Sequence, residues 1–599
     1  MRGQGHWSEG VPDESITRDE AARLVRRLGR MLRPRAVPIV IASLLLTAQV
    51  ATLLAGPVLV RWGIDSGLTA HDGSVLNRAA LAYAALAVVG LVLGRAVTVL
   101  VARIGEGFLR ELRGRLFRHL MSLSMGYFER EQTGRLVARM TSDIDALQEL
   151  LSQGLVLMVQ NVLLFVGAVV VIVVMSWQLA LAVLVIVPPV YVSSRWFRRV
   201  SNVAYREVRD RIATNMSTLQ ESLEGIRVVQ AFARESSFTT RFEATNEAQF
   251  DANLHTVRLS ARYFPAVEFS SVAGTAIILG VGGAMVHADA ISIGVVSAFV
   301  LYLNNLFEPI QQLSQFYNTV QSAGAALGKV FTLLDTQPTV DERPGAFDVP
   351  VGDLAIEVDG VSFSYAPDAP SVLDDVTLAI AAGERIALVG PTGAGKSTLA
   401  KLLARFYDPT AGRILLGGAD LRDLTATSLR HALCVVPQEG YLFAGSLREN
   451  VRIGRVGATD ADVDAAIAVL GLTERFAGFP QGLDSEVHEG GARLSAGERQ
   501  LVSLARAALA DPKILVLNEA TSNLDPGTEH AVEAALEALM SGRTVIVVAH
   551  RLSTAARADR VAVVDGGGIA EIGTHDELVA RGGRYAALYA AWQSHHAAH

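Results

Sequence analysis

The chain has 599 residues, of which 50% are hydrophobic and only 19% are charged, so part of it is expected to lie in lipid, since about 25% is usual for soluble proteins. The formal net charge of −7 argues against a nucleic-acid partner held by a broad basic surface. Cys434 is the single cysteine, which excludes an intrachain disulfide and a thiolate metal cluster.

Apolar stretches in the first half of the chain predict membrane-spanning helices, each of which needs about 20 mostly apolar residues. The third and fourth stretches are joined by three residues, and the fifth and sixth by four, so each pair is expected to form a helical hairpin. A long polar segment precedes the first stretch, and no cleavable signal sequence is expected. The six predicted spans are residues 37–60, 79–101, 155–175, 179–192, 265–286 and 291–310.

Arginine is concentrated before the first span, between spans two and three, and between spans four and five. By the positive-inside rule, these segments and both chain ends lie in the cytoplasm of a multi-pass protein of the cell (inner or plasma) membrane. Residues 105–153 and 193–262 have few prolines and apolar residues at helical spacing. Each of these two loops is therefore predicted to extend beyond the lipid as a helical hairpin.

Ionisable and amide side chains occur within or beside the predicted spans. Such groups in a membrane are candidates for a functional site, here a substrate cavity. The alternative to a cavity role is that these side chains form hydrogen bonds between helices or lie near the membrane interface. The candidate cavity residues are Arg95, Glu268, Asn304 and Glu308.

The character of the chain changes near residues 336–351, where proline, glycine and acidic residues replace the apolar runs. The predicted fold is a membrane α-helical domain, with six transmembrane helices and long cytoplasmic helical extensions, fused to an α/β P-loop NTPase domain. The expected parts are a cytoplasmic segment 1–35, a transmembrane domain 36–330, a linker 331–352 and a nucleotide-binding domain 353–599.

A phosphate-binding loop follows the short apolar run 386–389, which suits a buried strand, and precedes a helix-like segment. In this G-x-x-x-x-G-K-S pattern the glycines let backbone N–H groups wrap phosphates, Lys396 adds a cation, and the Ser397 hydroxyl can ligate Mg²⁺. ATP and Mg²⁺ are the predicted cofactors. The predicted loop consists of Gly390, Pro391, Thr392, Gly393, Ala394, Gly395, Lys396, Ser397 and Thr398.

A second buried strand, residues 514–517, ends in Asn518 and Glu519. The Glu519 carboxylate fits a general base that polarises the water attacking the γ-phosphate. Asn518 stands where an aspartate would help to hold Mg²⁺, so weakened hydrolysis with retained ATP binding is expected.

Residues 494–500, Leu-Ser-Ala-Gly-Glu-Arg-Gln, lie between these motifs, and the combined order resembles the ATP-binding cassette (ABC) transporters. The match is to exporter-type half-transporters, in which six spans are fused to one cassette, and it covers nearly the whole chain after the N-terminal tail. The resemblance implies an ATP hydrolase coupled to transport by alternating access. Its expected activity is export or flipping of an amphipathic small molecule, lipid or peptide by one half of a dimer.

The resemblance also implies roles for individual residues. Tyr365 is similar to the aromatic that stacks on adenine, and Gln438 to the glutamine that reaches Mg²⁺ and the attacking water. His550 is similar to the switch histidine at the γ-phosphate, and Asp525 to a residue of the D-loop at the dimer interface. The signature residues, which act on the ATP of the partner cassette, are Ser495, Ala496, Gly497 and Glu498.

Three departures from the family pattern are interpreted either as tolerated drift or, as favoured here, as signs of a heterodimer with one weakened ATP site rather than a homodimer. They are Asn518, the pair Ala496 and Glu498 in place of Gly and Gln, and Gly490 in place of Arg. Two further functions stay open: an importer on the same fold, and a regulatory half that binds ATP and gates its partner. The expected partners are a second half-transporter, membrane lipid and an unknown small-molecule substrate, without nucleic acid.

Overall fold

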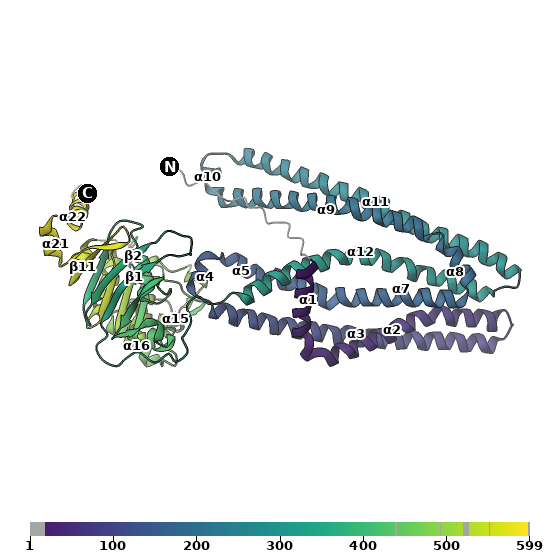
Figure 1. The fold of residues 1–599 in the computed structure, drawn as a ribbon, viewed down its shortest axis with the longest axis horizontal. Helices are drawn as coiled ribbons and strands as arrows, with labels where there is room; N and C mark the ends of the chain where they lie inside the picture. Colours follow the sequence, from purple (N-terminus) through teal and green to yellow (C-terminus); the bar gives the residue numbers. More distant parts are fainter. Residues whose placement is uncertain (1–17, 438–439, 492, 519–525, 550–551, 597–599) are drawn as a thin grey trace. The chain divides into compact units, whose positions relative to one another are not determined.

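The computed structural model describes residues 18–437, 440–491, 493–518, 526–549 and 552–596, and the chain forms two compact units (Figure 1). The first unit comprises Met1–Met121 and Thr133–Thr336, and the second comprises Ser122–Gln132 and Gln337–His599. The first is helical and the second is α/β, which confirms the predicted fold class. The short segment Ser122–Gln132 belongs with the second unit although helices of the first unit flank it in sequence.

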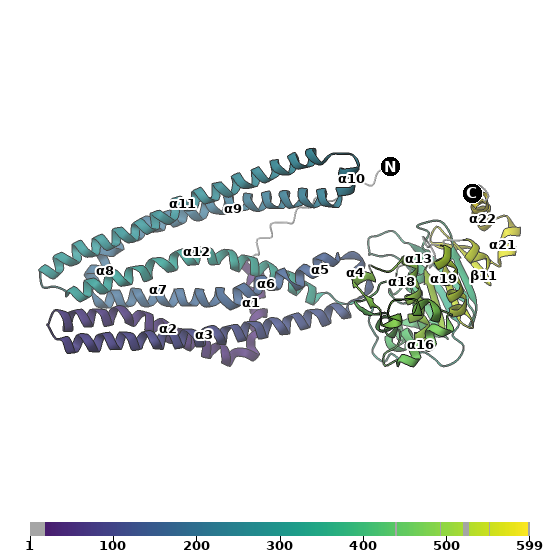
Figure 2. The same ribbon diagram turned by 180° about the vertical axis from the view of Figure 1, so that it is seen from behind.

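The first unit is built from long helices (Figures 1 and 2). Helices α9 and α11 run side by side, and α12 packs against α2, α7 and α11. The elements are α1 (Arg18–Leu32), η1 (Arg33–Arg35), α2 (Ala36–Trp62), η2 (Gly63–Leu68), α3 (Gly73–Ser122), α5 (Thr133–Met140), α6 (Ser142–Glu149), η3 (Leu150–Gly154), α7 (Leu155–Met175), α8 (Trp177–Leu184), α9 (Val187–Glu224), α10 (Ile226–Ala231), α11 (Glu235–His287) and α12 (Ile293–Asp335).

Among the described residues, five stretches are long and apolar enough to cross a membrane: Ala22–Leu68, Gly73–Ser122, Thr133–Met175, Trp177–Glu224 and Glu235–His287. They contain the first five predicted spans, and α12 begins with the shorter apolar stretch Ile293–Leu303. Side chains such as Leu91 and Val174 are 74% and 81% exposed. Apolar surface of this kind is stable against lipid or a second chain rather than against water.

The fourth span differs from its predicted bounds because the helix is interrupted within it, just before a pair of prolines. Helix α8 ends at Leu184, and α9 begins at Val187 with Pro188 and Pro189 in its first turn. The first N–H groups of a helix have no intrahelical acceptor, so proline is tolerated there. Helix α9 then continues far beyond the predicted end at residue 192.

The second unit is organised around a six-stranded sheet of order β12-β11-β3-β10-β9-β6, counted over the described residues. Neighbours from β11 to β6 are parallel, and β11 pairs with β12 antiparallel. A second sheet has the order β2-β1-β4-β5. The strands are β1 (Ile356–Phe363), β2 (Leu373–Ile380), β3 (Arg385–Val389), β4 (Ala411–Leu416), β5 (Ala419–Asp420), β6 (Leu433–Val436), β7 (Gly445–Ser446), β8 (Glu486–Val487), β9 (Ile514–Asn518), β10 (Thr544–Val548), β11 (Arg560–Asp565) and β12 (Gly568–Gly573).

Both faces of the six-stranded sheet are buried, as its alternating side chains show. Ile386 and Leu388 of β3 belong to the core shared with β1, β2 and β4, whereas Ala387 and Val389 belong to the core beneath the helices. A parallel strand covered on both faces is apolar at every position, which explains the continuous apolar runs in the sequence. The two predicted strands are therefore confirmed as β3 and β9.

Helices cover the sheet and carry the loops of the second unit (Figure 2). They are α4 (Met125–Arg130), α13 (Lys396–Leu403), η4 (Leu421–Asp423), α14 (Ala426–Ala432), α15 (Leu447–Arg452), α16 (Asp460–Val469), α17 (Thr473–Ala477), η5 (Gly482–Asp484), η6 (Glu489–Gly491), α18 (Ala496–Ala510), α19 (Pro526–Met540), α20 (Leu552–Ala556), α21 (His575–Arg581) and α22 (Arg584–His596).

Candidate functional site

The predicted phosphate loop connects β3 to α13, and glycine is required at both of its ends. Gly390 has a φ of +146°, and a Cβ there would lie 2.1 Å from the carbonyl oxygen of Val564. Gly395, the N-cap of α13, has a φ of +107°, and its Cβ would lie 2.6 Å from Leu373 Cδ2. Only glycine fits these positions without moving a neighbour, so the loop can turn back tightly over the start of α13.

Lys396 places a cation inside this loop. Its side chain is only 5% exposed, and its Nζ donates hydrogen bonds to the carbonyl oxygens of Gly390 (2.7 Å) and Pro391 (2.9 Å). The first N–H groups of α13 have no intrahelical acceptors, and the glycine N-cap has no side chain to offer them one. A buried ammonium beside the N-terminus of a helix is an arrangement suited to binding a phosphate group.

Tyr365 lies beside the first turn of the same helix. Its hydroxyl is 3.0 Å from Thr398 Oγ1, and its ring is edge-to-face with the rings of Phe363 and Tyr407, at centroid distances of 4.9 and 5.3 Å. The side chain is 37% exposed. The aromatic ring is therefore held next to the phosphate loop with surface left for a planar ligand.

Helix α4 is bonded to this aromatic cluster, a contact that the sequence did not predict. The Glu129 carboxylate accepts hydrogen bonds from Lys401 Nζ and from the Tyr407 hydroxyl, both at 2.9 Å. Burial, followed by the hydrogen bond to Glu129, raises the pKa of Tyr407. A Cβ at Gly126 would lie 2.7 Å from the Tyr407 ring, so α4 packs closely on it. The sequence predicted only that residues 105–153, which include α4, form a helical hairpin.

The signature segment forms the start of α18, where its own carboxylate occupies the helix N-terminus. The Glu498 N–H donates to Ser495 Oγ (3.2 Å), and the Ser495 N–H donates to Glu498 Oε2 (2.8 Å), which makes a capping box. Ala496 is the first residue of the helix and Gly497 is buried. The substitution of Glu for the family's Gln thus places a negative charge at this N-terminus.

Asn518 ends β9, two strands from β3 in the sheet, with β10 between them. Both parallel strands end at the same edge, so Asn518 and the phosphate loop lie at one side of the sheet. The exposed hydroxyl of Ser397 and the amide of Asn518 are oxygen ligands suited to a Mg²⁺ ion that keeps waters and phosphate oxygens. Four predicted residues lie outside the described residues: Gln438, Glu519, Asp525 and His550.

The candidate substrate-cavity residues are distributed over three helices. Arg95 on α3 and Glu268 on α11 are exposed. Asn304 and Glu308 lie on α12, and their side chains are outside the described residues. A polar pair that the sequence did not predict joins α7 to α12, where Asn161 Nδ2 donates to Gln312 Oε1 at 2.7 Å.

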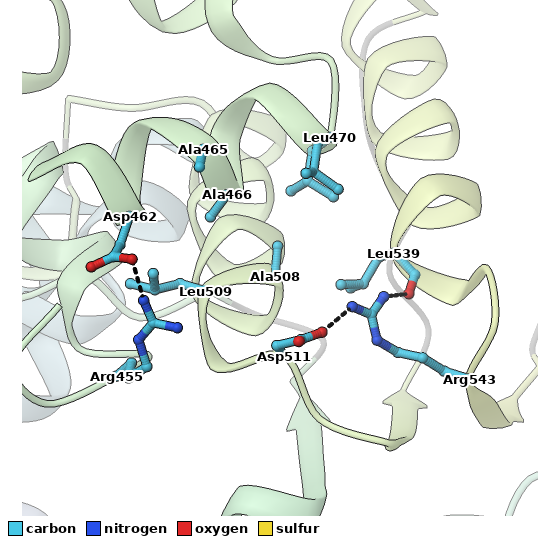
Figure 3. Close-up of a pocket in the computed structure, with 11 residues that line it drawn as sticks. Arg455, Asp462, Ala465, Ala466, Leu470, Ala508, Leu509, Asp511, Leu539 and Arg543 are labelled. Atoms are coloured by element: carbon cyan, nitrogen blue, oxygen red, sulfur yellow. Dashed lines mark hydrogen bonds and ion pairs between the residues drawn. The ribbon is translucent and has the colours of Figure 1, made fainter. Parts of the chain in front are cut away.

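A cavity of about 250 Å³ lies elsewhere in the second unit, between α16, α18 and α19 (Figure 3). Its charged side chains are paired with one another: Arg455 with Asp462 and Arg543 with Asp511, each at 2.7 Å. Small apolar side chains such as Ala466 and Ala508 line its floor. None of the predicted nucleotide-binding residues lines this cavity, so it is separate from the phosphate loop.

Comparisons with known proteins match both halves of the chain. A family model described as the ABC transporter transmembrane region matches residues 39–310, and one described as ABC transporter matches residues 373–522. Among curated proteins, an uncharacterized ABC transporter ATP-binding protein, YknV of Bacillus subtilis, is 36% identical over 91% of this chain and 90% of its own length. An ATP-dependent lipid A-core flippase of Syntrophus aciditrophicus is 34% identical over 94% of each chain.

Two further relatives extend the comparison. A multidrug efflux ATP-binding/permease protein of Mycobacterium tuberculosis is 38% identical over 94% of this chain, which spans about half of that relative's length (47%). The solved structure of a bacterial Atm1-family ABC exporter with ATP bound superposes with a TM-score of 0.73 at 31% identity, covering 94% of this chain and 98% of that chain.

Proposed function

Because the chain belongs to the ABC transporter family and has the domain order of an exporter, we propose that it is one half of a dimer that moves an amphipathic substrate across a membrane. ATP binding between two cassettes drives the change of access, and hydrolysis resets it. The observation that carries this proposal is the phosphate loop between β3 and α13, with Lys396 buried inside it. It occurs in a chain whose other half consists of long apolar helices.

Binding of ATP uses the residues around α13. The adenine stacks on Tyr365, and the phosphates lie in the loop 390–398, where backbone N–H groups and Lys396 donate to them. Lys396 leaves the carbonyl oxygens of Gly390 and Pro391 when phosphate oxygens replace them. Ser397, Gln438 and the Asn518 amide are the proposed ligands of Mg²⁺, which when bound neutralises charge on the phosphates.

The roles of the residues proposed for hydrolysis are assigned from the family resemblance. Glu519 follows β9 directly and acts as the general base on the attacking water, and His550 contacts the γ-phosphate from the end of β10. The amide of Asn518 carries no charge, so it holds the metal less firmly than a carboxylate. Slower hydrolysis at this site is the proposed consequence.

This chain's signature residues Ser495 and Gly497 act on the ATP of the partner cassette, and the partner's signature segment completes this chain's own site, with Asp525 at the interface. Asn518 and the charged capping box of Glu498 support a heterodimer with unequal sites over a homodimer. A regulatory half that binds ATP and gates a catalytic partner is the second candidate, and Asn518 is the observation that favours it.

The names of two relatives support an amphipathic substrate, since one is a multidrug efflux protein and another a lipid A-core flippase. Arg95, Glu268, Asn304 and Glu308 are the proposed polar residues of the substrate pathway. The arginine-rich loops favour a cell-membrane orientation with the cassette and both termini in the cytoplasm.

Transport into and out of sealed vesicles containing the purified chain, alone and with a candidate partner half, tests the proposal. Export requires ATP on the cassette side and movement of the substrate away from that side. Glu519→Gln is the matched control, because it keeps ATP binding and removes the base. Movement towards the cassette side would establish the importer, and ATP-independent movement would refute the proposal.

A further inference from the structure

Helix α1 carries basic side chains that the fold and the ATP site do not use. Arg23, Arg26 and Arg30 are separated by three and four residues, and Arg33 follows three residues later in η1. Residues at this spacing lie on one face of a helix. All four side chains are exposed, and together they form the arginine stripe.

The opposite face of α1 is apolar. Leu24, Leu28 and Met31 are spaced by four and three residues and are half-buried. A helix with an arginine face and an apolar face, placed just before a membrane span, has the pattern of helices that lie in the membrane interface. Figures 1 and 2 show α1 crossing the direction of the long helices at the end where α2 begins.

A bidentate ion pair to α12 determines the rotation of α1 about its own axis. Arg27 donates from both terminal nitrogens to the two Asp335 oxygens of α12, at 2.6 and 2.7 Å, and its guanidinium carbon lies 4.2 Å from the Phe331 ring centroid. The hydrogen bond from Arg27 lowers the pKa of Asp335. Because Arg27 lies between the apolar face and the arginine stripe on the helical wheel, this contact turns the stripe away from α12.

Two arginines next to the stripe differ from its members because each of the two has a carboxylate partner. Arg27 pairs with Asp335, and Arg35 pairs with Glu111 at 2.8 Å. Across the part of the chain that the structure describes, no carboxylate pairs with Arg23, Arg26, Arg30 or Arg33. The stripe therefore carries four positive charges that are not in ion pairs among the described residues, with the acidic Asp19 at the N-terminal end of the same face, and the Arg27–Asp335 contact sets its orientation.

The charge of the stripe lies next to lipid-facing surface. Helix α2 starts at Ala36, three residues after Arg33, and its first turns expose Val37, Val40 and Ile41. Headgroup phosphates lie where the hydrocarbon layer ends, which is the level at which such an apolar surface begins. We propose that the arginine stripe binds the phosphate groups of anionic membrane lipids and anchors α1, and through it α12, at the membrane surface.

Photo-crosslinking of the full chain in bilayers tests this proposal. The probes are photoactivatable phosphatidylglycerol and phosphatidylcholine, and crosslinks are mapped by mass spectrometry to residues 18–35. The triple variant Arg23→Gln/Arg26→Gln/Arg30→Gln removes three charges from the stripe. The matched control, Arg206→Gln/Arg209→Gln/Arg227→Gln, removes three exposed arginines from α9 and α10. The triple Arg→Lys variant at the stripe keeps the charge.

The expected result is preferential crosslinking of phosphatidylglycerol to α1, reduced at least about five-fold in the Gln variant at low salt. The Lys variant and the α9/α10 control are expected to retain it. Equal labelling by both lipids, or undiminished labelling of the Gln variant, would overturn the proposal. So would displacement by inorganic phosphate beyond that by chloride at equal ionic strength, which would indicate a site for the free anion. Labelling that follows an added acidic protein rather than the lipid would also overturn it.

Discussion

Helices α13 and α18 both begin at residues of the proposed ATP sites, but their N-termini differ in charge. The N-cap of α13 is Gly395, and Lys396 supplies a positive charge at its start. The N-cap of α18 is Ser495, whose backbone N–H is already bonded to the Glu498 carboxylate. One N-terminus is open to an anion, whereas the other carries an anion of its own. If both N-termini meet triphosphate as proposed, the N-terminus of α13 is the more favourable of the two for an anion.

The largest expected effect is on ATP binding and comes from a steric clash in the phosphate loop that precedes α13. In Gly390→Ala, the Cβ would lie 2.1 Å from the Val564 carbonyl oxygen at a φ of +146°. Strain and overpacking should cost at least about 2 kcal/mol locally and displace the loop. We expect loss of ATP binding, measured by equilibrium binding of a fluorescent ATP analogue. Gly566→Ala, at a φ of +57° with nothing within 4 Å of its Cβ, is the control that should bind normally.

The second prediction concerns the metal side of the same site. Asn518→Asp restores a carboxylate beside the proposed Mg²⁺ and should raise the rate of hydrolysis by about ten-fold, or about 1.4 kcal/mol of barrier. Asn518→Ala removes the oxygen ligand and should lower the rate. Steady-state phosphate release with Mg²⁺ present measures both. An unchanged rate in the Asp variant would contradict the proposal that Asn518 weakens hydrolysis.

The third prediction concerns the charge at the N-terminus of α18, where the signature segment lies. Glu498→Gln keeps a capping side chain but removes the negative charge that we propose to face the partner's triphosphate. The ATP concentration for half-maximal hydrolysis should fall by about five-fold, as expected for about 1 kcal/mol of relieved repulsion. Glu498→Ala separates charge from capping, because it also loses the capping box, worth about 1 kcal/mol of helix stability. If the ATP concentration for half-maximal hydrolysis is unchanged in the Gln variant, the charge of Glu498 does not oppose ATP binding, and the proposed difference between the two N-termini is wrong.

The smallest expected effect lies at the contact between α4 and the aromatic cluster. The pKa of Tyr407 is raised, so its protonated form stabilises the fold at pH values below the ordinary tyrosine pKa, near 10. That contribution is lost as the pH rises further, through the raised pKa. Glu129→Gln should lower the pKa of Tyr407 and reduce stability by about 1 kcal/mol. Ultraviolet titration of phenolate, with Tyr407→Phe to identify the signal, measures the shift; an identical titration in wild type and variant would contradict it.

The sequence predicted those features that depend on neighbouring residues. The phosphate loop is recognisable because Gly390 and Gly395 must adopt conformations that other residues avoid, and the spans because each needs its own length of apolar residues. Both β3 and β9 were predictable because strands buried on two faces are apolar at every position.

Contacts between distant residues could not be predicted in this way. Arg27 and Asp335 are 308 positions apart, and Glu129 and Tyr407 are 278 apart. Nothing in the local pattern at either residue specifies its partner. The break between α8 and α9 inside the fourth predicted span was missed for a different reason, because a proline pair is compatible both with the end of a helix and with the first turn of a new one.

The central claim is that this chain's own loop between β3 and α13 holds the nucleotide that powers transport. The most direct test is to measure binding of Mg·ATP to the purified full chain in lipid and to the Lys396→Ala variant. We expect saturable binding to the wild-type chain and a loss of at least about a hundred-fold in affinity in the variant, the equivalent of about 3 kcal/mol for a charge-assisted phosphate contact. Failure of the wild-type chain to bind Mg·ATP, or equal binding by both chains, would contradict it.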